Sequence, residues 1–273
     1  MSRGKTAVAG AATFGIGECA GTSSLEMAAS AGLLALDDAG IALAEVDGLF
    51  ICLPDDMFAA LSLAEHLGLR PKFTDCNRTG GSAPVSHLIT AAALLEAGEI
   101  DVALLSYGSN QRSAGGALST PARPSPYEAP YHPLFPASGY ALAAARHMHQ
   151  YGTTREDLAA VAVAARQWAN GNPEAFAQGE LTIDDCLNSR MISSPLAKSD
   201  FCLVTDGAAA IVLTRADRAR DCRQAPVALL GAAAATSHHH ISSMPDLTVT
   251  AARESGARAF AQAGVTPAEV DVV

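Results

Sequence analysis

The chain alternates short, mostly apolar runs with longer segments of helical spacing, and this alternation limits its possible folds more than any other feature. The clearest apolar runs span residues 46–53, 101–106 and 207–214. Between them lie segments such as residues 82–97, where apolar side chains recur every three or four positions. Strands that are apolar along their whole length are typical of a sheet covered by helices on both faces. We therefore predict an α/β fold.

Capping signals predict where the helices begin and end. Ser23 offers an N-cap for a helix over residues 25–39, and Gly40 marks its end. Gly68 and Gly98 mark two more helix ends in the same way. We predict further helices over residues 57–67, 82–97, 137–151, 155–169 and 248–263, further strands over residues 72–76 and 227–234 and from residue 270 onward, and a long loop over residues 111–135.

Charge and composition exclude several classes of protein. The chain carries 18 Lys and Arg against 28 Asp and Glu, and only 17% of its residues are charged. Its 49% hydrophobic content excludes a disordered chain, and its acidity argues against nucleic-acid binding, which needs clustered Lys and Arg. No apolar run reaches the ~18 residues that span a bilayer. We therefore expect a cytoplasmic protein without a membrane span, whose six cysteines are free thiols and mostly buried.

Two familiar motifs and one histidine have simpler explanations. Residues 15–20 fit the G-x-G-x-x-A dinucleotide fingerprint, but the next helix begins near Ser24, so no helix N-terminus would meet the pyrophosphate. The three histidines at residues 238–240 are adjacent in a loop without a nearby cysteine or carboxylate cluster, so we predict no metal site. His87 lies within the helix over residues 82–97, and we predict a hydrogen-bonded core histidine rather than a base.

Three segments together resemble one known family. They are residues 77–83 (NRTGGSA), 107–113 (YGSNQRS) and 205–210 (TDGAAA). In their order and spacing the chain resembles the thiolase superfamily, specifically its sterol-carrier-protein-type, lipid-transfer-like branch (acetyl-CoA acetyltransferase-like). The resemblance implies a layered α-β-α fold with two similar halves. Residues 1–225 would form the N-terminal domain, with an inserted loop region at about 111–200, and residues 226–273 would begin an incomplete C-terminal domain.

The resemblance also implies a nucleophile that this chain lacks. In active thiolases the turn before the Ala-rich helix carries a cysteine, and the helix N-terminus lowers the pKa of its thiol. Gly81 occupies that position here, and Cys76 comes too early in the chain to replace the cysteine. Glycine cannot be acylated, but the backbone N–H groups of Gly80, Gly81 and Ser82 could still receive a thioester or enolate oxygen. The other interpretation is that Gly80 and Gly81 only permit a tight turn.

Two more residues are candidates for binding coenzyme A. Arg112 follows a predicted strand, where α/β proteins bind ligands, and would either hold a phosphate or brace a loop. Cys202 precedes the TDGAAA segment, which in the family approaches the pantetheine arm of coenzyme A. It would either line that arm or be a small buried side chain. No residue is matched to a catalytic role, and we expect the family's remaining catalytic motifs to lie beyond Val273.

The resemblance implies an enzyme that makes or breaks C–C bonds next to a thioester. Gly81 favours the non-covalent retro-aldol cleavage found in the lipid-transfer-like branch over acyl transfer. The acyl-CoA thioester is then the substrate, no resident cofactor is expected, and the acyl chain is left open. The resemblance further implies a homodimer formed through the strand at residues 72–76 and a partner with an OB-fold and a zinc ribbon. The alternative is a non-catalytic acyl-CoA-binding or scaffold subunit.

Overall fold

The computed structural model describes residues 3–114 and 125–272, which divide into two compact units. The first unit comprises Met1–Ser119, Thr205–Ala235 and Glu254–Val273, and the second comprises Thr120–Val204 and Thr236–Arg253. The second unit is therefore formed by two insertions into the chain of the first. The domain boundary predicted after residue 225 stays a prediction.

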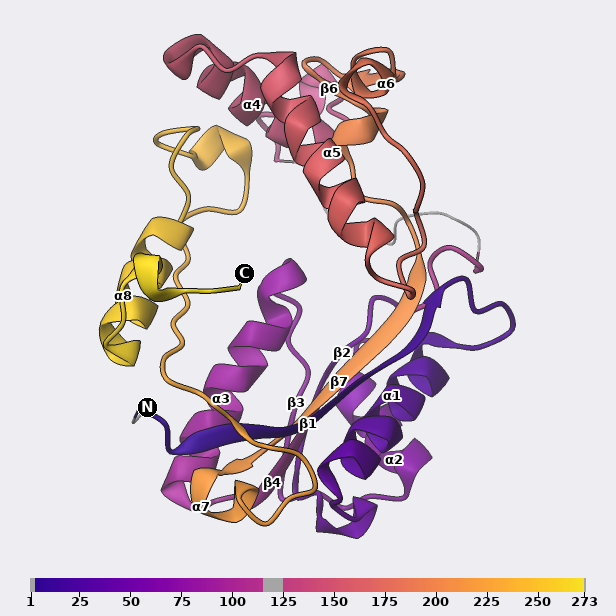
Figure 1. The fold of residues 1–273 in the computed structure, drawn as a ribbon, viewed down its shortest axis with the longest axis vertical. Helices are drawn as coiled ribbons and strands as arrows, with labels where there is room; N and C mark the ends of the chain where they lie inside the picture. Colours follow the sequence, from indigo (N-terminus) through magenta and orange to yellow (C-terminus); the bar gives the residue numbers. More distant parts are fainter. Residues whose placement is uncertain (1–2, 115–124, 273) are drawn as a thin grey trace. The chain divides into compact units, whose positions relative to one another are not determined.

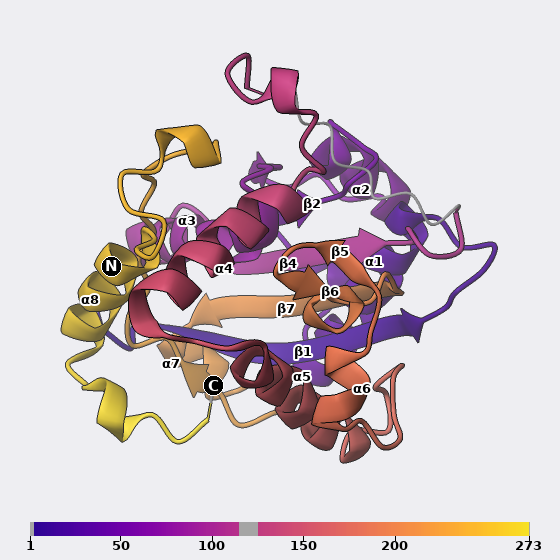
Figure 2. The ribbon, with the colours of Figure 1, turned by 90° about the horizontal axis from the view of Figure 1, so that it is seen from above.

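The first unit is built on a six-stranded mixed sheet. Its strands are β1 (Thr6–Gly17), β2 (Gly48–Cys52), β3 (Phe73–Asp75), β4 (Val102–Ser109), β7 (Asp206–Arg215) and β8 (Val227–Ala228), in the spatial order β3-β2-β4-β7-β1-β8. Strands β2, β3 and β4 pair in parallel, and β7 pairs antiparallel with its neighbours β4 and β1 (Figure 2). The carboxyl ends of β1 to β4 and the amino end of β7 therefore meet at one edge of the sheet, which we call the carboxyl edge.

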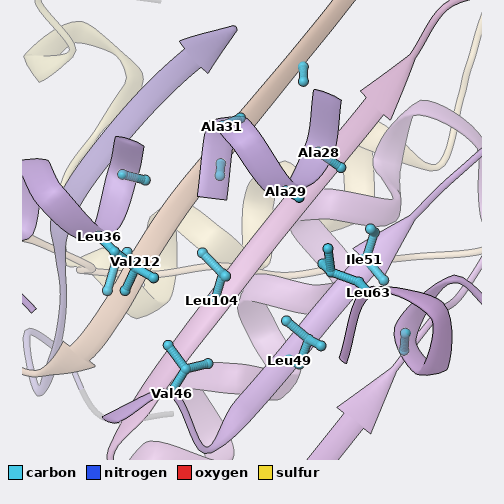
Figure 3. Close-up of a cluster of buried hydrophobic side chains, with 14 of the residues drawn as sticks. Ala28, Ala29, Ala31, Leu36, Val46, Leu49, Ile51, Leu63, Leu104 and Val212 are labelled. Carbon is cyan, nitrogen blue, oxygen red and sulfur yellow. The ribbon is translucent and has the colours of Figure 1, made fainter. Parts of the chain in front are cut away.

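Helices cover both faces of this sheet, which confirms the predicted α/β class (Figure 1). The helices α1 (Ser24–Ala39) and α2 (Ala59–Leu67) lie on one face, and α3 (Ala83–Ala97) lies on the other. Successive residues of β2 show why both faces are apolar. Leu49 and Ile51 join the core cluster beneath α1 and α2 (Figure 3). Phe50 joins the cluster beneath α3.

Glycine and alanine allow α1 to pack closely on the sheet. A Cβ atom added to Gly10 of β1 would clash with the backbone of Ala35 and Ala39, and one added to Gly108 of β4 would clash with the backbone of Ser24. The face of α1 that packs here is itself made of small residues, because its buried residues include Ala28, Ala29, Ala31, Gly32, Ala35 and Ala39. The small side chains thus set the distance between helix and sheet.

The caps predicted from the sequence are confirmed at the helix ends. The Ser23 side chain accepts the N–H of Glu26, and the Glu26 carboxylate accepts the N–H of Ser23, which forms a capping box before α1. Gly40, Gly68 and Gly98 end the first three helices with positive φ angles. These local signals act within a few residues, so sequence patterns are sufficient to predict them.

Two strands predicted near the C-terminus differ from the structure. β8 comprises two residues in place of the strand predicted over residues 227–234. Residues 270–272 form no strand. A strand needs a neighbour along its length. β8 has only a short pairing with β1, and within the described part of the chain no strand pairs with residues 270–272.

The last helix also begins later than predicted. α8 (Ala252–Ala263) starts at Ala252 rather than at residue 248. The carboxylate of Asp246 accepts the N–H of Thr248, and the hydroxyl of Thr250 accepts the N–H of Ala252. Such local side-chain hydrogen bonds to the backbone favour turns over helix.

The second unit is mainly helical. Its elements are α4 (Ala137–Tyr151), α5 (Arg155–Asn170), α6 (Ile183–Leu187) and the two-stranded sheet of β5 (Met191–Ser193) and β6 (Leu196–Ala197). The two helices predicted over residues 137–151 and 155–169 are confirmed, and part of the predicted loop, residues 115–124, lies outside the described residues. No helix in the described ranges is long and apolar enough to cross a membrane.

Candidate active site

The carboxyl edge of the sheet is where an open α/β fold is expected to bind a ligand. The loops that follow β1, β2, β3 and β4 lie there, together with the first residue of β7. Helices α1, α2 and α3 each follow one of these strands, so their N-termini face the same edge. Helix N-termini carry partial positive charge, which favours anions and developing oxyanions. The predicted site residues Gly80, Gly81, Ser82 and Arg112 all belong to this edge.

Gly80, Gly81 and Ser82 form a 3₁₀ turn between β3 and α3. Gly80 has a φ angle of 76°, in the left-handed region that favours glycine, whereas Gly81 has no positive φ. A Cβ atom added at either position would meet no heavy atom within 4 Å. The requirement for a tight turn therefore explains Gly80 but not Gly81. Position 81 has room for a Cβ atom, and the backbone conformation does not require glycine there.

The N-terminus of α3 has no side-chain cap. Ser82, its N-cap residue, donates its hydroxyl to the carbonyl oxygen of Thr79 at 3.0 Å instead of accepting an N–H of the helix. The N-terminus of α1 differs, because the Ser23 side chain caps it. Ala83, the first residue of α3, donates its N–H to the carbonyl oxygen of Gly80, and Pro84 after it has no N–H. The Ser82 side chain adds no acceptor here, so the partial positive charge of this helix end remains available to a ligand oxygen.

Two cysteines lie close to this turn. Cys76 donates its thiol to the carbonyl oxygen of Met57 at 3.5 Å. Burial raises the pKa of the Cys52 thiol at the end of β2. The nearby Cys76 raises this pKa further, whereas the Arg78 guanidinium lowers it. Arg78 also donates Nη2 to the carbonyl oxygen of Pro54 at 2.6 Å, which ties the turn to the loop after β2. A raised pKa disfavours the thiolate, so Cys52 is a poor nucleophile.

Asp206, the first residue of β7, anchors two loops of the carboxyl edge. Its buried carboxylate accepts the backbone N–H groups of Cys19 at 2.8 Å, Arg112 at 2.9 Å and Ser113 at 3.1 Å. Burial raises the pKa of Asp206, but these hydrogen bonds outweigh it and hold the pKa below its usual value. The ionised carboxylate thus joins the loops after β1 and β4. Sequence reasoning missed this role, although an acid at the start of an otherwise apolar strand is a usable signal.

Arg112 braces the same two loops. Its Nε lies 3.1 Å from the Glu18 carboxylate, and Glu18 follows β1 while Arg112 follows β4. The backbone N–H of Arg112 is held by Asp206. These contacts support the bracing interpretation of Arg112, and its binding of a phosphate stays a prediction.

The prediction that most cysteines are buried is wrong. Cys186 is buried, Cys202 is exposed, and Cys19, Cys52, Cys76 and Cys222 are half-buried. Most of them lie at or just beyond the ends of elements, where the loops admit solvent. Cys202 belongs to the second unit, so it is exposed there rather than a small core residue. Its predicted place beside the pantetheine arm stays a prediction.

The histidines differ in their surroundings. His87 of α3 is 1% exposed, and its Nε2 accepts the N–H of Asn77 at 3.3 Å, which confirms the predicted hydrogen-bonded core histidine. In the second unit, Nδ1 of His240 lies 4.0 Å from the Glu128 carboxylate. Across residues 3–114 and 125–272, no group of three or more His, Cys, Asp or Glu side chains is arranged to hold a metal ion.

Comparison with known proteins identifies relatives along nearly the whole chain. Residues 233–273 match the family described as Thiolase C-terminal domain-like. The chain is 35% identical to the 17-hydroxy-3-oxo-4-pregnene-20-carboxyl-CoA lyase of Mycobacterium tuberculosis, over 99% of this chain and 74% of the lyase. It is 32% identical to the steroid side-chain-cleaving aldolase of Thermomonospora curvata, over 98% of this chain and 72% of that protein.

A solved structure agrees with these relatives. The Ltp2-ChsH2(DUF35) aldolase superposes with a TM-score of 0.88 at 30% identity, over 99% of this chain and 72% of that chain. Its similarity extends across both insertions as well as the sheet. Since the fold and the relatives agree, the chain belongs to the thiolase superfamily, in its sterol-carrier-protein and lipid-transfer-like branch.

Proposed function

We propose that this protein is an acyl-CoA aldolase, which cleaves a β-hydroxyacyl-CoA into a carbonyl compound and a shorter acyl-CoA without forming an acyl-enzyme. The observation that carries this proposal is Gly81, because the position of the family's nucleophile has room for a side chain and carries none. The relatives that support it are named a CoA lyase and an aldolase. In the substrate named for the lyase, the 17-hydroxyl is β to the thioester carbonyl, as a retro-aldol reaction requires.

The proposed reaction needs a base, an oxyanion site and a proton donor. The base removes the proton of the β-hydroxyl, the oxygen electrons form the new carbonyl, and the bond between the α- and β-carbons breaks. Its electrons pass into the thioester as an enolate, whose α-carbon is then protonated. The N-terminus of α3 provides partial positive charge for the enolate oxygen, next to the backbone N–H groups of Gly80, Gly81 and Ser82. Claisen condensation through an acyl-enzyme would need a nucleophile, and Gly81 supplies none.

Partner proteins form part of the proposal. The structure of the Ltp2-ChsH2(DUF35) aldolase contains a second protein, and we extend this to an OB-fold and zinc-ribbon partner for the present chain. We also propose a homodimer formed through β3, because β3 is the outermost strand on its side of the sheet. A cytoplasmic location completes the proposal.

The second candidate is a subunit that binds acyl-CoA without cleaving it. Gly81 also favours this function, since an inactive member needs no nucleophile. Binding by itself does not distinguish the two functions, whereas product formation does.

The experiment incubates the 273-residue chain with 17-hydroxy-3-oxo-4-pregnene-20-carboxyl-CoA, alone and with a DUF35 partner. Retro-aldol cleavage of the C17–C20 bond yields a 17-keto steroid and propionyl-CoA, both resolved by liquid chromatography and mass spectrometry. Gly81→Leu, which fills the space at the turn, should abolish cleavage, and Gly81→Ala is its matched control. Binding without products in either mixture would favour the non-catalytic subunit.

A further inference from the structure

A continuous chain of hydrogen bonds runs from the buried His87 to the first turn of α3. Nε2 of His87 accepts the N–H of Asn77 at 3.3 Å, and Oδ1 of Asn77 accepts the Thr79 hydroxyl at 3.2 Å. The carbonyl oxygen of Thr79 accepts the Ser82 hydroxyl at 3.0 Å. These bonds span residues 77–82, the turn that carries Gly80 and Gly81, so the conformation of the turn depends on its attachment to His87.

The imidazole of His87 is buried and packed in the core. It is 1% exposed, and its ring packs against Phe50 of β2 with the ring centroids 5.8 Å apart. The Asp75 carboxylate of β3 lies 3.8 Å from Nε2 and is the charged group that faces the ring, while β2 contributes only the apolar ring of Phe50 at this contact. Because the imidazole is held on these sides, a change at Nε2 must be taken up by the turn.

The hydrogen bond from Asn77 depends on the protonation of His87. Nε2 accepts this bond only when it carries no proton, which assigns the neutral Nδ1–H tautomer. Protonation would place a second donor opposite the Asn77 N–H, and Nε2–H would turn to the Asp75 carboxylate instead. Burial lowers the pKa of His87, and Asp75 opposes this, so that the pKa lies below 6.5 and the ring is neutral at neutral pH.

We propose that His87 is a positioning residue: by accepting the Asn77 N–H, it holds residues 77–82 in the conformation that presents the N-terminus of α3 to the thioester oxygen, and its protonation releases that turn. This inference rests on the proposed function, because the turn matters to catalysis only if it binds the enolate. It assigns to His87 a role that is neither that of a base nor that of a filler of the core.

Three variants separate this role from a structural one. His87→Gln keeps an acceptor oxygen near the position of Nε2 but does not titrate, whereas His87→Phe keeps a ring and removes the acceptor. His149→Gln, at an exposed histidine of α4, is the matched control. Thermal unfolding checks that each variant folds, and if His87→Phe does not fold, the comparison of wild type with His87→Gln still decides the question.

The first measurement does not require turnover. Hydrogen exchange of the Asn77 amide, corrected for intrinsic pH effects, is measured at neutral pH and at pH values well below the ordinary histidine pKa of 6.5, because burial lowers the pKa of His87. Wild type and His149→Gln should lose protection on the acid side, His87→Gln should not, and His87→Phe should be unprotected throughout. Equal protection in wild type and His87→Phe at all pH values would overturn the proposal.

The second measurement uses cleavage of 17-hydroxy-3-oxo-4-pregnene-20-carboxyl-CoA. Wild-type kcat/KM should fall on the acid side, and this fall should be absent in His87→Gln. His87→Phe should lose about tenfold to a hundredfold in kcat, the range expected for a misplaced oxyanion site. An acid fall that persists unchanged in His87→Gln would contradict the inference. If wild type cleaves nothing, the proposed function fails, while the exchange data still decide the role of His87.

Discussion

At the scale of single residues, Gly80 and Gly81 are neighbours, but only Gly80 has a backbone conformation that favours glycine. Gly80 has a φ angle of 76°, whereas Gly81 has no positive φ, and neither lacks space for a Cβ atom. We therefore predict that Gly80→Ala lowers the free energy of unfolding by about 1 kcal/mol through backbone strain. Gly81→Ala should change it by less than about 0.5 kcal/mol. Chemical denaturation of both variants checks this, and equal losses would mean that both glycines serve the backbone.

A substitution at Gly81 could also introduce a nucleophile. Gly81→Cys would place a thiol at the uncapped N-terminus of α3, where the positive end of the helix lowers the thiol pKa. We expect this variant to accumulate a thioester after incubation with acetyl-CoA, seen as an acetyl group in the intact mass. Gly256→Cys is the control, because Gly256 has equal room but lies within α8 rather than at its start. Absence of the adduct in Gly81→Cys would place the family's nucleophile elsewhere.

The lowered pKa of Asp206 predicts how the free energy of unfolding changes at acid pH. Its pKa is lowered in the folded state, so its contribution is fully present above the unfolded value of about 3.8 and is lost as the pH falls from there through the folded pKa. Asp206→Asn should lower the free energy of unfolding at neutral pH by about 1–3 kcal/mol, because the amide keeps one acceptor oxygen and turns an NH2 donor toward the remaining backbone N–H. Asp206→Asn should also weaken the fall of the free energy of unfolding at acid pH. Asp217→Asn, at an exposed aspartate, is the control, and an equal effect there would contradict this role.

At the scale of elements, the packing of α1 on the sheet depends on glycine. A Cβ atom at Gly10 would clash with the backbone of Ala35 and Ala39, which no side-chain rearrangement relieves. We predict that Gly10→Ala lowers the free energy of unfolding by about 1–3 kcal/mol, the usual cost of overpacking. Gly256→Ala, within α8 and with open space, should instead raise it by about 0.5–1 kcal/mol. Thermal or urea unfolding measures both, and a neutral Gly10→Ala would show that α1 can shift.

The elements also show what the sequence could predict. The helix ends at Ser23, Gly40, Gly68 and Gly98 were predictable because capping depends on a few adjacent residues. The short β8 was not, because the length of a strand depends on what lies beside it. The hydrogen-bonded core position of His87 could be predicted from its place on an apolar helix. Its partner Asn77 could not, because the contact depends on how the loop after β3 folds back onto α3.

At the scale of the whole molecule, the sheet topology assembles the candidate site. Gly81 follows β3 and Arg112 follows β4, and the parallel pairing of these strands with β2 brings both residues to the carboxyl edge. The place of Gly81 at the family's nucleophile position rests on a local motif and stays a prediction. The acid at the start of β7 is visible in the sequence, but its hydrogen-bond partners lie far away in the chain, so the structure was needed to identify them.

Cleavage without an acyl-enzyme is tested by the intact mass of the protein during turnover of 17-hydroxy-3-oxo-4-pregnene-20-carboxyl-CoA. In one quenched sample, mass spectrometry reads both the CoA products and the covalent state of the chain. Retro-aldol cleavage without an acyl-enzyme predicts that propionyl-CoA accumulates while the protein mass stays unchanged. An acyl group on Cys202, or on any other cysteine, would contradict non-covalent cleavage, because the chain would then use a covalent nucleophile.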